Sequence, residues 1–144
     1  MNLPFGSSVL DAATRLLAPL IMLFAAYVVA HGHYSPGGGF QGGVILAAAL
    51  ILVRLVRGGA TEWGLTRERA LFLASAGVLF YASIGFLSLF GAGRYLDYDA
   101  LPLDLPPVRL HAVGSFGIEL GVAMGVVGVM VLIFDTLVAW GQRD

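Results

Sequence analysis

The stretch that decides the fold runs from Leu120 to Ile133 and reads LGVAMGVVGVMVLI, with no charged side chain. It lies inside a longer apolar segment, 111–140, which is long enough to cross a bilayer. Three further apolar segments precede it, at residues 8–30, 41–57 and 70–90. The sequence therefore predicts an all-α fold: an integral membrane bundle of four transmembrane helices, one domain over residues 1–144, with a glycine-rich loop before the second helix.

The composition excludes several other classes of protein. Of the 144 residues, 58% are hydrophobic and 12% are charged, and the mean hydropathy is +0.88. Soluble domains average about 45–50% apolar and about 25% charged residues, so this chain has too little charge to cover a soluble globule. A net charge of −1 without any lysine argues against a nucleic-acid partner. The absence of cysteine excludes disulfides, iron–sulfur clusters and thiolate zinc sites.

The arginines indicate the orientation in the membrane. Six of the eight lie at the N-terminal end, between the second and third spans, or at the C-terminus, namely Arg15, Arg54, Arg57, Arg67, Arg69 and Arg143. The other two, Arg94 and Arg109, lie between the third and fourth spans. Because cytoplasmic loops are enriched in arginine, we expect a multi-pass protein of the cell membrane with both termini cytoplasmic. Asp135, near the cytoplasmic end of the last span, is expected to be solvated or interfacial.

Between the first two spans the chain reads HGHYSPGGGFQGG, from His31 to Gly43. Gly37, Gly39 and Gly42 match the dinucleotide pattern G-x-G-x-x-G, but that motif requires a βαβ unit, and here a membrane span lies on each side. A flexible turn is the simplest alternative, yet a turn needs one or two glycines and additional ones cost entropy. The cluster indicates unwound backbone that another helix approaches or that lines a polar cavity. The predicted interface residues are Pro36, Gly37, Gly38, Gly39, Phe40, Gln41, Gly42 and Gly43.

The segment from His33 to Ala47, HYSPGGGFQGGVILA, resembles the signature of the MrpB/MnhB family. These proteins are small subunits of the multisubunit Mrp-type sodium/proton antiporters. A second segment, from Gly114 to Val122 (GSFGIELGV), is similar to the family's last helix, and the resemblance extends over essentially the whole chain. It implies a hetero-oligomer with other antiporter subunits, Na+ and H+ as transported ions, and a role in the sodium path and in assembly. Related subunits also occur in membrane-bound hydrogenases and other relatives of respiratory complex I.

Glu119 lies within the fourth span, among apolar residues. A buried carboxylate is costly when ionised and unpaired, so Glu119 is expected to be protonated, paired or bound to a cation. This makes it a candidate for the ion or proton path, with a structural hydrogen bond as the alternative. At about 100° per residue, it lies opposite a stripe of glycines suited to close packing on the third span, and must face another span or subunit. The stripe consists of Gly114, Gly117, Gly121, Gly125 and Gly128.

His31 and His33 are further candidates for the ion or proton path, because histidine titrates near neutral pH. One of them is expected to form a hydrogen bond with the glycine segment. Their spacing does not place both on one helical face, so no metal site is expected. The chain also lacks a cofactor motif and a nucleophile–base pair, so neither a cofactor nor an enzymatic activity is expected.

These observations predict a membrane subunit of an Mrp-type cation/proton antiporter, surrounded by lipid and other subunits. Two alternatives stay open at this point. The chain is otherwise the homologous subunit of a membrane-bound hydrogenase or another complex I-related oxidoreductase, or a purely structural assembly subunit.

Overall fold

The computed structural model describes residues 8–32, 37–57, 65–92 and 94–141. These residues form four long α-helices and one short 3-10 helix, and they include no strand. The elements are α1 (Ser8–Ala30), α2 (Gly38–Arg57), α3 (Arg67–Ala92), η1 (Tyr98–Ala100) and α4 (Pro107–Gly141). All four α-helices are long and apolar enough to cross a membrane. The predicted all-helical fold with four membrane spans is therefore confirmed.

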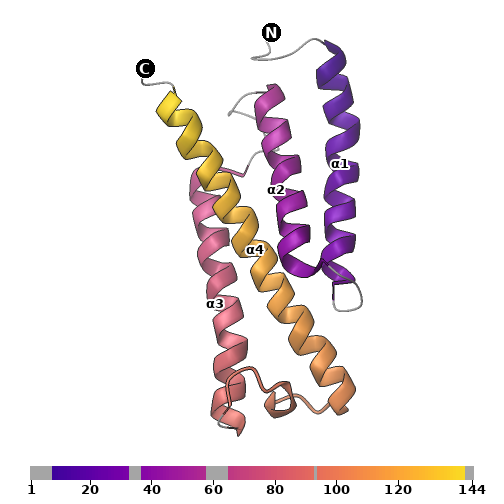
Figure 1. Ribbon diagram of the computed structural model, residues 1–144, viewed down its shortest axis with the longest axis vertical. Helices are drawn as coiled ribbons and strands as arrows, with labels where there is room; N and C mark the ends of the chain where they lie inside the picture. The colour runs from indigo at the N-terminus through magenta and orange to yellow at the C-terminus, as the bar shows by residue number, and fades with distance from the viewer. Residues whose placement is uncertain (1–7, 33–36, 58–64, 93, 142–144) are drawn as a thin grey trace.

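The four α-helices lie side by side in the order α1, α2, α4, α3 (Figure 1). Within the described residues, α3 contacts α4 and η1 but neither α1 nor α2. The hairpin formed by α1 and α2 ends partway along α4, whereas α3 and α4 continue together to the end that carries η1 (Figure 1). Because the helices form a row, both broad faces of the layer carry exposed apolar side chains for lipid or other proteins to cover.

The contact between α3 and α4 is made by residues with little or no side chain. A Cβ atom added to Gly77 would lie 2.6 Å from the carbonyl oxygen of Gly121. One added to Gly128 would lie 2.5 Å from the carbonyl oxygen of Ala70. Small residues let the two helix backbones approach each other closely, which is common between membrane helices. This contact fixes the direction in which the rest of α4 faces.

The glycines at the start of α2 are helical. α2 begins at Gly38, so the prediction of unwound backbone over residues 38–43 is wrong. The close approach of other helices is nevertheless present. A Cβ on Gly42 would lie 2.9 Å from the carbonyl oxygen of Ala25 on α1, and one on Gly43 would lie 3.0 Å from that of Ala123 on α4. This packing on two sides offsets the low intrinsic helix propensity of glycine.

Ion pairs join the helices at the end where α1 begins and α4 ends. Asp11 accepts hydrogen bonds from Arg15 Nε on its own helix and from Arg57 Nε on α2, each at 2.8 Å. On the other side of α2, Arg54 donates to the carboxylate of Asp135 on α4, and the Arg54 side chain is only 6% exposed. Asp135 is thus paired with a buried arginine, which corrects the expectation of a solvated or interfacial carboxylate.

We expect Asp135→Asn to destabilise the protein by about 2 kcal/mol, because Arg54 then keeps a buried charge without its counter-ion. Thermal unfolding of the purified complex, followed by the loss of this chain from the soluble fraction, measures the effect. The double variant Arg54→Met/Asp135→Leu removes both charges and should recover most of the lost stability. An unchanged unfolding temperature for Asp135→Asn would show that the pair contributes nothing.

Candidate ion site at Glu119

Glu119 lies deep within α4. It is about 18 Å along the helix axis from the first residue of α4 and about 33 Å from the last. One of its carboxylate oxygens, Oε2, is fully buried. An acidic group at this depth in an apolar helix is rare and is expected to have a function or a specific partner.

The glycine stripe on α4 determines which way Glu119 faces. Gly117, Gly121 and Gly128 lie against α3, and Gly114 lies against Tyr98 of η1. Gly125 differs from the others, since a Cβ added there would meet nothing within 4 Å. With the stripe on α3 and η1, the opposite side of α4 carries Glu119 toward the α1–α2 hairpin.

Three glycines of that hairpin contact Glu119. Gly32, just beyond the end of α1, lies against Oε2, and a Cβ on Gly38 would lie 3.5 Å from the carboxylate carbon. Gly39 lies against the main chain of Glu119, and a Cβ there would overlap the Glu119 carbonyl group. Gly32, Gly38, Gly39 and Glu119 together form the hairpin site. The glycine segment and the intramembrane acid, two separate features of the sequence, therefore meet at one place.

The turn into α2 depends on glycine. Gly37 has φ +149° and Gly38 has φ +58°, values that residues with a Cβ rarely adopt. The Gly37 carbonyl accepts the hydrogen bond of Gln41 N at 3.4 Å, so the regular bonding of α2 starts here. The N–H groups of the first turn have no partner within the helix and carry the positive end of its dipole. Next to them an ionised carboxylate gains about 0.3–1 kcal/mol, which partly offsets the cost of burying its charge.

The end of α1 contributes the opposite polarity. Its last carbonyl groups point toward the turn, where Tyr27 O accepts from His31 N at 3.0 Å and Val29 O accepts from Gly32 N at 3.3 Å. The hairpin site thus combines a carboxylate with the bare backbone of two helix ends at membrane depth. Membrane transporters use helix ends in this way to accommodate anionic groups, protons and Na+.

The other predicted site residues are less central. His31 Nδ1 lies 3.2 Å from the carbonyl oxygen of Tyr27, and the two rings stack at 4.2 Å, so these contacts of His31 are within its own helix end. Phe40 and Gln41 are exposed on α2. His33 and Pro36 lie outside the described residues.

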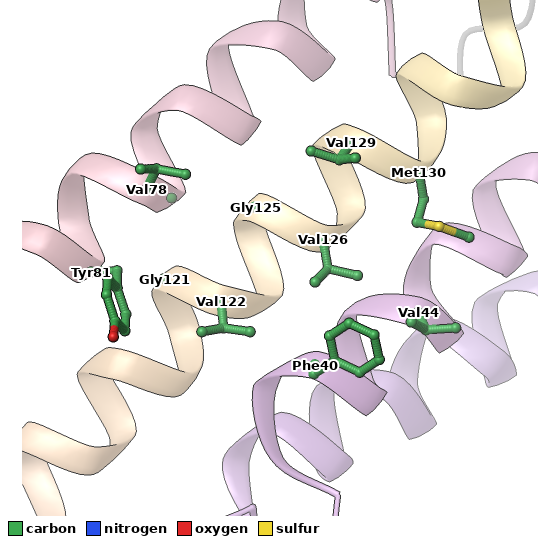
Figure 2. A pocket seen from close by; sticks show the side chains of 11 residues that line it. Phe40, Val44, Val78, Tyr81, Gly121, Val122, Gly125, Val126, Val129 and Met130 are labelled. Atoms are coloured by element: carbon green, nitrogen blue, oxygen red, sulfur yellow. The ribbon is translucent and has the colours of Figure 1, made fainter.

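Phe40 borders a groove of about 410 Å³ on one face of the layer (Figure 2). Phe40 and Val44 line it from α2, and Val78 and Tyr81 line it from α3 (Figure 2). Its α4 wall includes Gly125, the stripe glycine whose Cβ position is open. The lining is apolar, so this part of the glycine segment presents a surface to lipid or to another transmembrane helix.

Sequence reasoning missed Tyr98, whose ring lies against Gly114. Burial raises the pKa of Tyr98 above its usual value, and the neighbouring Tyr81 and Glu119 raise it further. Tyr98 belongs to the loop between α3 and α4, and its spacing from Glu119 in the sequence carries no helical periodicity that could have revealed their proximity. The electrostatic influence of Glu119 therefore extends toward the end of the molecule that carries η1.

Four membrane-spanning helices and a buried carboxylate at a glycine hairpin define a multi-pass membrane protein with an ionisable intramembrane site. Residues 9–132 match the family model described as "Domain related to MnhB subunit of Na+/H+ antiporter", and the chain belongs to this family.

Two relatives illustrate the match. The first, from Bacillus subtilis (strain 168), is named as the B-type component of a Na(+)/H(+) antiporter. The chain is 31% identical to it over 130 residues, which cover 90% of this chain and 91% of that protein. The chain is also 30% identical to "Putative antiporter subunit mnhB2" of Staphylococcus aureus (strain MRSA252), with 90% and 92% covered. The family resemblance noted in the sequence is thereby confirmed.

Proposed function

We propose that this chain is a membrane subunit of a multisubunit Na+/H+ antiporter and that Glu119 lies on the cation/proton path. The family and the names of the relatives support the first part, and they favour an antiporter over a hydrogenase-type complex. The chain would act as a transport subunit rather than as an enzyme. The second part rests on one observation, the contact of the buried Glu119 carboxylate with the backbone of Gly32 and Gly38.

The hairpin site supplies opposing influences on the charge of Glu119. Apolar surroundings favour the protonated, neutral carboxyl group, whereas the first turn of α2 favours the ionised carboxylate. A group balanced in this way can gain and lose a proton during each transport cycle without a large energetic barrier in either direction. The rival role, a structural carboxyl group that only joins α4 to the hairpin, does not require ionisation.

The arrangement of charges supports an orientation with both termini in the cytoplasm. The start of α1, the end of α2 and the start of α3 carry Arg15, Arg54, Arg57, Arg67 and Arg69. All of these lie at one end of the helix layer, and η1 lies at the other end. Cytoplasmic ends of membrane proteins are enriched in arginine, so η1 would face the outside of the cell.

We expect the chain purified alone to show no Na+/H+ exchange. Its open row of helices leaves apolar faces uncovered, including the groove beside Phe40, and the hairpin site provides only one candidate carboxylate. The measurement compares proteoliposomes containing the single chain with proteoliposomes containing the complex that copurifies with it, using Na+-dependent changes of internal pH. Only the complex should respond. Robust exchange by the single chain would contradict the subunit assignment.

A further inference from the structure

A pair of ionisable side chains lies at the η1 end of the molecule. His111 Nε2 on α4 is 3.1 Å from the carboxylate Oδ1 of Asp99 in η1. The two side chains are 58% and 60% exposed, so both are accessible from the aqueous side of this end. A carboxylate paired with an imidazole at a water boundary can capture a proton and hold it on the imidazole.

Tyr98 lies next to this pair and reaches inward from it. Its ring meets the His111 ring edge-on at a centroid distance of 5.6 Å and lies over Gly114. A Cβ on Gly114 would collide with the Tyr98 ring, so the glycine makes room for the phenol against α4. Along α4, Gly114 is about 5 Å further in than His111, and Glu119 is about 8 Å further still. Tyr98 therefore fills the interval between the exposed pair and the buried carboxylate.

The electrostatic surroundings suit a phenol that passes on protons. Burial keeps the pKa of Tyr98 raised, and Tyr81 and Glu119 contribute in the same direction. Tyr98 thus keeps its hydroxyl proton at physiological pH, and a neutral hydroxyl group can donate one hydrogen bond while accepting another. Tyr98 is also close enough to Glu119 to be affected by its charge.

We propose that Asp99, His111 and Tyr98 form the proton entry route from the outer surface to Glu119. A proton from water binds the His111 imidazole beside the Asp99 carboxylate. The imidazolium then gives a proton to the Tyr98 hydroxyl oxygen as that hydroxyl gives its own proton to the Glu119 carboxylate, with water bridging any gap between the groups. The net change is one proton moved from outside water to Glu119, with His111 and Tyr98 restored. This proposal rests on the role proposed above for Glu119.

The groups that influence His111 come from three elements. Asp99 and Tyr98 face it from η1, and Tyr81 is the titratable residue of α3 that interacts with Tyr98. On α4 itself the nearest charged residues in the sequence are Arg109 and Glu119. Among these, the Asp99 carboxylate is the group in direct contact with the imidazole, so the pair is the place where outer pH acts first.

The test uses two variants of the intact antiporter complex in proteoliposomes, with the pH on the η1 side varied from acidic to alkaline. Tyr98→Phe removes the hydroxyl group but keeps the ring on Gly114, and His111→Gln can still donate a hydrogen bond to Asp99 but cannot carry a proton. At alkaline pH we expect each variant to lower the maximal rate of Na+-driven proton movement about tenfold, a modest loss for a proton-transfer group because water can partly replace it. The Na+ concentration for half-maximal rate should not change.

The pH profile separates a relay from a purely structural role. When protons are abundant on the η1 side, bulk supply compensates, so the defect should shrink at acidic pH. Asp104→Asn, an exposed acid of the same loop, serves as the matched control and should retain the full rate. Rates are normalised to the amount of assembled complex. A full rate in both variants, or an equal loss at every pH, would overturn the relay.

The same assay distinguishes failure of the relay from failure of the proposed function. If Glu119→Gln is inactive while Tyr98→Phe and His111→Gln transport normally, only the entry route is refuted. If Glu119→Gln transports normally, the role of Glu119 is refuted and the route that ends on it falls with it.

Discussion

Gly39→Ala is expected to prevent α2 from docking on α4 and to remove the chain from the assembled antiporter. The added methyl group would overlap the carbonyl group of Glu119. That carbonyl belongs to the backbone of α4, which is itself held against α3 by close contacts at Gly121 and Gly128. α4 therefore cannot move aside, and we expect a loss of about 3 kcal/mol or more, at the upper end for overpacking a well-packed interface.

Gly125→Ala is the matched control, because it makes the same substitution in α4 where a Cβ meets nothing within 4 Å. Replacing a helical glycine by alanine at an open position should be neutral or stabilising by up to about 1 kcal/mol. Immunoblotting of the purified complex measures retention of the chain, and Na+-driven proton movement measures its activity. Equal retention of Gly39→Ala and Gly125→Ala would mean that the glycine segment is only a flexible connection.

The number of helices and their approximate bounds could be predicted because each apolar segment has the length of a bilayer. The glycine stripe could also be predicted, since spacings of three and four residues place glycines on one side of a helix. The helical state of residues 38–43 could not. Glycine clusters locally favour irregular backbone, and only the contacts of Gly39, Gly42 and Gly43 with neighbouring helices make a helix favourable there.

The partners of the ionisable groups were also beyond the reach of the sequence. Helical spacing places Glu119 away from the stripe, but it does not say that the α1–α2 hairpin ends beside it. Arg54 and Asp135 are 81 residues apart, and nothing local links them. The order α1, α2, α4, α3 likewise follows from side-chain packing among helices that are apolar on most sides, where hydrophobic periodicity gives little guidance.

Glu119→Gln should leave the complex assembled but nearly abolish its cation-dependent proton movement. Glutamine has almost the same shape and can donate and accept hydrogen bonds, so the packing against Gly32 and Gly38 is retained. It cannot ionise, and a group that must gain and lose a proton in every cycle then stops the cycle. Glu119→Asp keeps an ionisable carboxyl group but withdraws it from the hairpin, so it should retain part of the activity with a shifted pH profile.

The decisive measurement is the dissipation of a pH gradient on addition of Na+ to membrane vesicles that contain the Glu119→Gln complex, with the amount of each protein of the complex checked by immunoblotting. We predict normal protein content and dissipation slower by about a hundredfold or more, the scale of losing an essential proton-transfer group. Normal dissipation by Glu119→Gln would contradict the proposed role, and would leave Glu119 as a residue that only holds α4 against the α1–α2 hairpin.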